Sequence, residues 1–364
     1  MHTLKETGSS SLALPEDSYI YSIVPSSRTE FAAISSDDSL RIFDANKLSH
    51  ASLVATNTHD DGVTSLRTYD ANNQLVITGG RDGKVKLWDL RHRKNSAALV
   101  VESPNQAPVL STASCSETNS IVAGTELLSH QAIVAFWDAR SPSQPHLQYV
   151  ESHNDDVTEL QYHPTRHNVL LSGSTDGLVN IYDTTVTDED EALVQVINHG
   201  SVHHAGFINE RTIYALSHDE TFAIHPATDP DDQAQEPEPI QFGDLRQPLH
   251  CEYIAQFCVG SQAPYIAAGN KIDKRLDLIP LSPTPSWRFD EQNLWRLPGG
   301  HGEEVVRSVY VDEQNQSVFT CGEDGFVRAW KPETETDQDE GDTLMNAPRP
   351  KEKKAKEKAR FKPY

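Results

Sequence analysis

Short runs of alternating hydrophobic and polar residues, each following an Asp-Gly pair, recur along the chain. The clearest lies within Gly79 to Asp89, and similar segments lie at Ser172 to Asp183 and Thr320 to Trp330. Such alternation predicts a β-strand with one buried face, and Asp-Gly favours a tight turn because glycine readily adopts positive φ. Each segment therefore predicts a β-hairpin.

An aromatic or apolar position recurs near the end of each unit. The seven positions are separated by 45, 49, 45, 43, 54 and 51 residues. Repeats of this length predict four-stranded blades, and seven of them predict an all-β, seven-bladed β-propeller. The positions are Phe43, Trp88, Trp137, Tyr182, His225, Ile279 and Trp330.

Three of the repeats carry the same polar residues at the same spacing. A histidine lies 29 residues before the aromatic position, and a serine or threonine lies four residues before the turn aspartate. Such regularity across a loop of variable length is hard to obtain by chance. The sets are His59, Thr78, Asp82 and Trp88; His153, Ser172, Asp176 and Tyr182; and His301, Thr320, Asp324 and Trp330.

These sets resemble the repeats of WD-repeat proteins, in which the four side chains form a hydrogen-bonded tetrad in each blade. A buried carboxylate is tolerated only with such partners, so the resemblance implies that these residues are structural. The first, fifth and sixth repeats depart from that pattern, for example at Ala33 and Ala215. More closely, the chain is similar to the WD repeat-containing protein 89 group, which implies a propeller without an assigned activity. The segments that carry this likeness are Ala123 to Glu126, Phe136 to Arg140, His153 to Val157, Ser172 to Asp183, Ser217 to Glu220, Gly322 to Asp324 and Trp330 to Pro332.

A propeller ring needs a strand to close its last blade. After Trp330 the chain runs into Pro332 and an acidic stretch, so a fourth strand is missing there. We expect the N-terminal segment within Thr3 to Leu14 to supply it, because every sheet edge is then paired. The expected organisation is a propeller over residues 1–332, an acidic linker over 333–348 and a lysine-rich disordered tail over 349–364.

Charge is unevenly distributed along the chain, whose formal net charge is −23. Residues 349–364 hold eight basic residues against two acidic ones, so the body is strongly acidic. Such a body repels nucleic-acid phosphates and attracts basic proteins. There is no apolar run long enough to cross a bilayer and no secretory signal at the start, which predicts an intracellular protein of the cytoplasm or nucleus.

The four cysteines show neither disulfide nor metal-site spacing, and we expect them to be reduced and structural. Cys251 and Cys258 could provide two metal ligands, but no paired histidine motif accompanies them. The sequence therefore predicts no metal and no cofactor, and an enzyme is the least favoured class of function. The other two cysteines are Cys115 and Cys321.

Carboxylates follow the histidine in each of the three complete repeats. Because the blades are arranged radially, these carboxylates are expected on one face of the disc. Ordinary solvated surface accounts for them, as it does for the acidic run Asp188 to Glu191. The alternative is a site for Lys/Arg-rich segments of a basic protein, such as a ribosomal or chromatin protein. The six residues are Asp60, Asp61, Asp155, Asp156, Glu303 and Glu304.

Two functions remain in addition to the enzyme class. The first is a non-enzymatic scaffold or escort, a monomer within a larger complex, that binds a protein partner on the acidic face. The second is a substrate receptor of a cullin-RING ubiquitin ligase. For this second function, Trp88 to Arg91 and Trp137 to Arg140 resemble the Trp-Asp-x-Arg boxes that dock the damage-specific DNA-binding adaptor, with Arg91 and Arg140 as the docking residues.

The lysine-rich end resembles a nuclear import signal and is also typical of a solubilising tail. Deletion of residues 349–364 is expected to lower the nuclear fraction of the protein and to leave its melting temperature unchanged, because the tail lies outside the predicted propeller. Fluorescence microscopy of the full and truncated chains measures the distribution. Identical distributions would assign the tail to solubility.

Overall fold

The computed structural model describes residues 1–92, 95–229, 237–260, 263–284 and 286–333. The predicted lysine-rich tail, and all but the first residue of the predicted acidic linker, lie outside these residues. Within the described part of the chain, no helix has the length and apolar character needed to cross a membrane. The largest helix in that part, α1 (Glu189–Ala192), has four residues.

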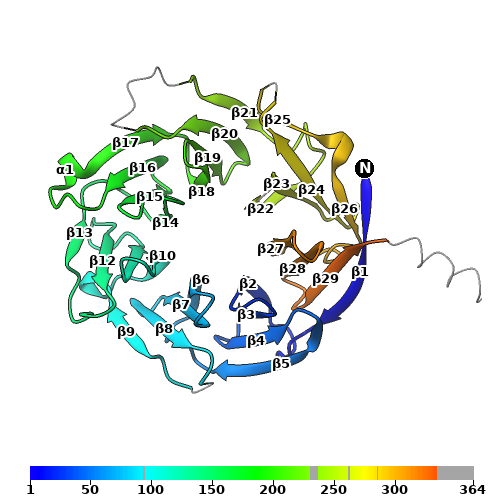
Figure 1. Ribbon diagram of the computed structural model, residues 1–364, viewed down its shortest axis with the longest axis horizontal. Coiled ribbons are helices and arrows are strands. Elements are labelled where there is room, and N and C mark those ends of the chain that lie inside the picture. Colours follow the sequence, from blue (N-terminus) through cyan, green and yellow to red (C-terminus); the bar gives the residue numbers. More distant parts are fainter. Residues whose placement is uncertain (93–94, 230–236, 261–262, 285, 334–364) are drawn as a thin grey trace, which may run out of the picture.

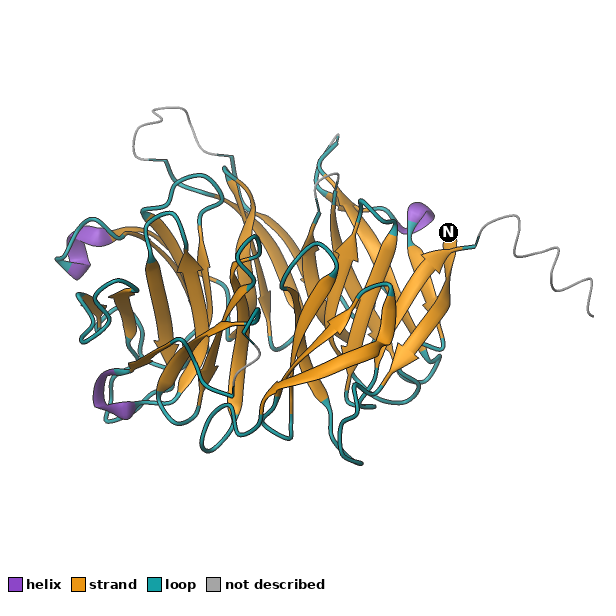
Figure 2. Cartoon of the chain, turned by 60° about the horizontal axis from the view of Figure 1, so that its bottom comes forward, coloured by secondary structure: helices purple, strands orange, loops and turns teal. Residues whose placement is uncertain are grey.

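Seven four-stranded antiparallel blades surround a central axis and form a disc (Figures 1 and 2). The predicted seven-bladed all-β propeller is therefore confirmed. Blades 1 to 4 follow one another in sequence. They comprise β2 (Ile20–Pro25), β3 (Glu30–Ser35), β4 (Leu40–Asp44) and β5 (Lys47–Ala55); β6 (Val63–Asp70), β7 (Leu75–Gly80), β8 (Lys84–Asp89) and β9 (Leu99–Glu102); β10 (Val109–Cys115), β11 (Ser120–Thr125), β12 (Val134–Asp138) and β13 (Leu147–Tyr149); and β14 (Val157–Tyr162), β15 (Val169–Ser174), β16 (Leu178–Asp183) and β17 (Leu193–Asn198).

Blades 5 to 7 complete the ring, and the seven positions predicted from the repeat spacing all lie on the third strand of their blades. Blade 5 comprises β18 (Val202–Asn209), β19 (Thr212–Ser217), β20 (Thr221–Pro226) and β21 (Ile240–Asp244). Blade 6 comprises β22 (Tyr253–Val259), β23 (Pro264–Asn270), β24 (Arg275–Ser282) and β26 (Trp295–Pro298), with β25 (Arg288–Phe289) beside β24. Blade 7 comprises β27 (Val306–Asp312), β28 (Ser317–Gly322), β29 (Val327–Pro332) and β1 (His2–Ser10); two 3-10 turns lie at Pro104–Gln106 and Glu291–Asn293.

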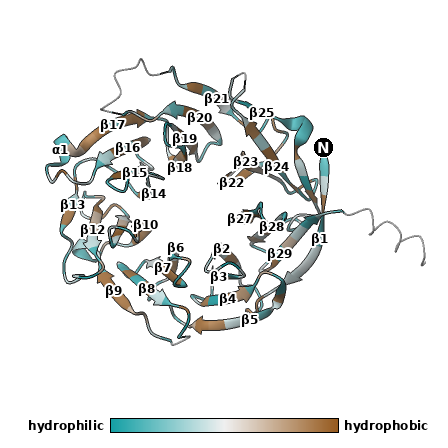
Figure 3. Cartoon of the chain, viewed as in Figure 1, coloured by the Kyte–Doolittle hydropathy of each residue, from teal (hydrophilic) through white to brown (hydrophobic). Residues whose placement is uncertain are grey.

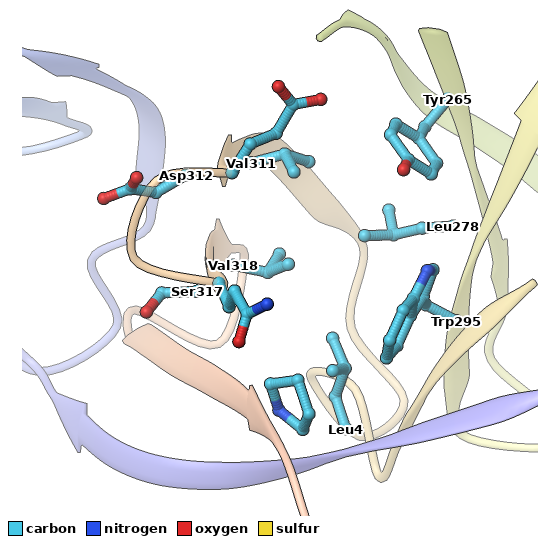
Figure 4. Close-up of a pocket in the computed structure, with 11 residues that line it drawn as sticks. Leu4, Tyr265, Leu278, Trp295, Val311, Asp312, Ser317 and Val318 are labelled. Atoms are coloured by element: carbon cyan, nitrogen blue, oxygen red, sulfur yellow. The ribbon is translucent and has the colours of Figure 1, made fainter. Parts of the chain in front are cut away.

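The N-terminal strand closes the last blade, as expected. β1 pairs antiparallel with β29, from Leu4 opposite Pro332 to Ser10 opposite Val327. Its first residues also pair in parallel with β26 of blade 6, so β1 joins two neighbouring blades. Beside this seam lies a mostly apolar pocket of about 170 Å³, which Leu4 and Trp295 line (Figure 4). The pocket is smaller than the several hundred Å³ typical of small-molecule sites.

The hydrophobic core lies between blades. Figure 3 shows hydrophobic segments on outer strands such as β5, β9 and β17, whereas α1 is hydrophilic. One buried cluster joins Ile34 and Ile42 of blade 1 to Leu66, Val76 and Trp88 of blade 2. Equivalent clusters fill the other seams, so each blade is stabilised by its neighbours.

The residues predicted to recur together are in hydrogen-bonding contact. In blade 2, His59 Nε2 lies 2.7 Å from Thr78 Oγ1, His59 Nδ1 lies 2.8 Å from Asp82, and Trp88 Nε1 donates to Thr78 Oγ1 at 2.9 Å. Burial lowers the pKa of His59 despite the nearby Asp82 carboxylate, which favours a neutral ring. A neutral ring with its proton on Nδ1 donates to Asp82 and accepts from Thr78, so every polar group has a partner.

The same arrangement recurs in blades 4 and 7. His301 lies 2.7 Å from Asp324 and 2.8 Å from Thr320, whose hydroxyl accepts from Trp330 at 2.9 Å. In blade 4 the Tyr182 hydroxyl takes the place of the indole and lies 3.2 Å from Ser172 Oγ. His153 lies 2.7 Å from that Oγ and 3.1 Å from Asp176.

Two divergent blades hold a carboxylate in a different way. In blade 1, Asp37 accepts from Ser35 at 2.7 Å and from Ser39 at 2.6 Å, and pairs with Arg41 at 3.0 Å. In blade 6, the buried Asp277 accepts from Arg296 at 2.8 and 2.9 Å and also contacts Arg275. In these two blades, arginine therefore takes the place of histidine as the partner of the carboxylate.

Replacement of Asp324 by alanine is expected to destabilise the propeller by about 1–3 kcal/mol, because Arg328 and the buried His301 lose a partly buried acceptor. A lowered melting temperature measures the effect. The matched control is Asp60→Ala, an exposed carboxylate on the same face, for which a change within about 0.5 kcal/mol is expected. Equal melting temperatures for the Asp324→Ala variant and the parent would contradict the structural role.

Candidate functional site

Connections between strands alternate between the two faces of the disc. The loops that link one blade to the next, such as residues 56–62 and 299–305, share a face with the turn of each tetrad aspartate, which we call the tetrad face. The turns between first and second strands, and between third and fourth strands, lie on the opposite face. A cavity of about 450 Å³, lined by residues of the innermost strand of each blade, lies along the central axis, and we call it the channel.

The six predicted carboxylates lie on the tetrad face, but they are not equivalent. Asp155 and Asp156 are half-buried, and Asp156 accepts a hydrogen bond from the backbone N–H of Leu127 at 2.8 Å. Glu303 pairs with Lys274 at 2.9 Å, and a hydrogen bond from that lysine lowers the pKa of Glu303. The three that are exposed and have no side-chain partner within the described part of the chain are Asp60, Asp61 and Glu304.

An aromatic patch, formed by Tyr19, Tyr21 and Phe326, lies between the two loops that carry these three carboxylates. Its side chains are 42%, 37% and 39% exposed. The Tyr19 and Tyr21 rings lie 6.2 Å apart. Gly325, beside Phe326, packs directly against the backbone of Ser18, beside Tyr19. The patch therefore lies at the seam between blades 7 and 1. Loop 299–305 approaches it through the His301–Asp324 pair, and loop 56–62 through the bond from Thr58 to the turn that also contacts Tyr19.

Sequence reasoning missed this patch because its residues occupy no fixed repeat position. Tyr19 and Tyr21 flank the start of β2, and Phe326 follows a tetrad turn. Only the closure of the ring by β1 brings these segments together. Large aromatic residues at or beside the ends of strands β2 and β29 were a signal that could have pointed to it.

The channel wall contains a charge network that the sequence also did not reveal. Arg67 of blade 2 lies 2.6 Å from Glu159 of blade 4, which is also 3.2 Å from His204 of blade 5. Burial raises the pKa of Glu159, but Arg67 and His204 outweigh this effect and the net pKa lies below the ordinary value. A buried charge needs such partners, so the network fixes three blades relative to one another.

The predicted docking arginines lie on the opposite face in adjacent blades. Arg91 donates from Nε and Nη2 to Asp89 at 2.8 and 2.7 Å, and Arg140 donates in the same way to Asp138 at 2.9 and 2.7 Å. Hydrogen bonds from Arg140 lower the pKa of Asp138 to about 2. Both guanidinium groups are at least half exposed, and Nη1 of each can still donate to a partner.

The acidic run Asp188 to Glu191 is more ordered than a solvated linker. Asp188 caps α1 by accepting from the backbone N–H of Glu191. Glu189 accepts from the backbone N–H groups of Val150, Glu151 and Ser152 at 2.6 to 2.9 Å. The expectation of ordinary solvated surface was therefore wrong for Glu189, which positions the loop leading to His153.

Comparison with known proteins identifies the repeats. The family described as WD domain, G-beta repeat matches residues 51–89, 144–183 and 292–331, the three blades with the predicted His-Ser/Thr-Asp sets. The WD40 β-propeller domain of Doa1 superimposes with a TM-score of 0.65 over 91% of this chain and 98% of that domain, at 14% identity. This likeness to Doa1 supports the fold alone.

Several curated proteins are similar along most of the chain. An uncharacterized WD repeat-containing protein of Saccharomyces cerevisiae is 36% identical over 71% of this chain, and the match spans 64% of that relative. A WD repeat-containing protein 89 homolog of Dictyostelium discoideum is 25% identical over 82% of this chain and 79% of its own length, which confirms the expected resemblance. An uncharacterized WD repeat-containing protein of Schizosaccharomyces pombe is 32% identical over 74% of this chain and 82% of its own length. From this similarity and the repeat matches, the chain belongs to the WD-repeat protein family.

Proposed function

We propose that this chain is a non-enzymatic platform that binds a protein partner on its tetrad face, centred on the aromatic patch. The observation that carries the proposal is the placement of three exposed aromatic rings between two loops with unpaired carboxylates. Tightly bound protein interfaces typically combine buried aromatic anchors with a polar rim. The tetrad face offers both features in one place.

The charges beside the patch favour a partner segment rich in lysine and arginine. Asp60 and Asp61 lie on one side of the patch and Glu304 on the other. A single exposed ion pair contributes about 0–1 kcal/mol, so only several together favour binding appreciably. Lysine and arginine also bind over aromatic rings, so a basic segment would use the patch and the carboxylates together.

Neutralising the three free carboxylates tests the charge part of the proposal. The variant Asp60→Asn, Asp61→Asn and Glu304→Gln is expected to bind co-purified partners at least tenfold more weakly and with a smaller dependence on salt. Affinity purification with mass spectrometry identifies the partner, and binding at low and physiological ionic strength then measures the effect.

The control carries the same change in net charge elsewhere: Asp190→Asn, Glu191→Gln and Glu210→Gln, all at exposed positions. Equal affinity for the variant with the three neutralised carboxylates and for this control would overturn the role of the carboxylates.

A further variant, Tyr19→Ala with Phe326→Ala, removes the aromatic anchors and is expected to abolish binding. Unchanged binding by the aromatic variant would overturn the choice of face.

The opposite face supports a second proposal, a substrate receptor that docks a ubiquitin-ligase adaptor. The supporting observation is that Arg91 and Arg140 are exposed in adjacent blades and held by equivalent aspartates in the same fork. Two arginines fixed in this way lose little conformational entropy on binding.

The double variant Arg91→Ala with Arg140→Ala tests this docking. It is expected to abolish co-purification of the adaptor and to leave the melting temperature unchanged, because exposed ion pairs contribute little to stability. Arg246→Ala is the matched control, since Arg246 forms the same fork with Asp244 outside the two boxes. Absence of the adaptor from preparations of the unmutated protein would remove this function.

A further inference from the structure

We propose that Cys115, Glu117 and His167 form a zinc site on the opposite face, between blades 3 and 4. Cys115 ends β10, Glu117 lies in the turn from β10 to β11, and His167 lies in the corresponding turn of blade 4 before β15. Fifty-two residues separate the cysteine from the histidine. The site therefore depends on the ring bringing equivalent turns of neighbouring blades together.

The three donor atoms converge on one point. Cys115 Sγ lies 3.2 Å from His167 Nδ1 and 3.4 Å from Glu117 Oε2, and the nitrogen and the carboxylate oxygen are 4.0 Å apart. Typical Zn–S, Zn–N and Zn–O distances place tetrahedral donors roughly 3.3–3.7 Å apart. Shifts of a few tenths of an ångström in side chains alone would bring the three atoms to that spacing.

The contacts fit a metal better than a nucleophile activated by a base. In a Cys-His-carboxylate relay the cysteine and the carboxylate face different nitrogens of the imidazole, because the ring passes a proton between them. Here Cys115 and Glu117 both face Nδ1 of His167. A sulfur and a carboxylate oxygen beside one ring nitrogen is an arrangement expected of ligands that share a cation.

Comparison with other blades indicates that the side chain of Cys115 is not needed to close its turn. Asp70 in blade 2 and Asp312 in blade 7 occupy the position of Cys115, and each accepts from the asparagine three residues later, at 2.6 and 2.8 Å. In blade 3 the turn keeps a positive φ at Asn119, as at Gln74 and Gln316. Cys115 thus replaces the usual turn-closing aspartate without a change in the turn.

The side chain of His167 is likewise not needed to close its turn. In blade 4, His163 Nδ1 accepts the backbone N–H groups of Thr165 and Arg166 at 3.2 and 2.9 Å and so closes the turn itself. His167 is left with Nδ1 directed at Cys115 and with its side chain about half exposed. Burial raises the pKa of the Cys251, Cys258 and Cys321 thiols, which disfavours the thiolate that a metal needs.

The donor set favours zinc over hard cations. Thiolate and imidazole are ligands of Zn²⁺ and of late transition metals, whereas Ca²⁺ and Mg²⁺ require oxygen donors. Three protein ligands leave a fourth position, and the exposure of Glu117 and His167 opens it to solvent. His167 also lines a groove of about 950 Å³ between blades 3 and 4, so a bound ligand could reach the metal from this groove.

Titration of the purified, reduced full chain with Co²⁺ as a spectroscopic probe, followed by displacement with Zn²⁺, tests the site. One equivalent of Co²⁺ is expected to produce a sulfur-to-cobalt charge-transfer band, which only a thiolate ligand gives. Zn²⁺ is expected to abolish the band and to raise the melting temperature of the protein.

Variants separate this site from other histidine clusters. His167→Gln and Glu117→Gln are each expected to weaken Zn²⁺ binding at least tenfold, and His146→Gln, in the same groove, is the control that retains it. Cys115→Asp with Thr118→Asn restores the turn of blades 2 and 7, so it should fold and lose the charge-transfer band. Absence of the band in the parent, or parental Zn²⁺ affinity in His167→Gln, would overturn the proposal.

Discussion

The pairing of β1 with β29 is the contact on which the ring depends. Without it the outer edge of blade 7 would be open, and an open edge exposes unpaired backbone groups. The seam is also held by side chains: Leu4 packs in a cluster with Leu297 and Trp330, and Arg328 pairs with Glu6 at 2.8 Å. Because β1 also pairs with β26, one strand fixes blades 6 and 7 together.

Repeat spacing predicted those features that depend on residues of a single blade. The partners of His59, His153 and His301 lie at fixed separations, and the third-strand positions recur every 43 to 54 residues, so a single sequence suffices to find both. The missing strand followed from the need to pair every edge. The spacing of the repeats and the need to pair every strand edge thus predicted the architecture, without knowledge of which distant residues are in contact.

Contacts between blades could not be predicted in this way. Arg67 and Glu159 are 92 residues apart, and Cys115 and His167 are 52 apart, so neither pair is visible in a repeat pattern. The same limit applies to charge. From the sequence, six carboxylates were expected on one face. In the structure Lys274 pairs with Glu303, and the Leu127 N–H donates to Asp156, so these two carboxylates already have partners. Which charges remain available depends on loops whose conformations the repeat does not encode.

The two faces differ in how many of their polar side chains are needed to maintain the fold. On the tetrad face, the aspartates of the turns hold buried histidines, so only the connecting loops are free to vary. On the opposite face, Asp70 closes the first turn of blade 2 and His163 closes that of blade 4, whereas blade 3 keeps its turn with Cys115 at the position of Asp70. A side chain that its turn does not need can take another role. Cys115 and His167 are such residues, because their turns remain intact whatever the two side chains bind.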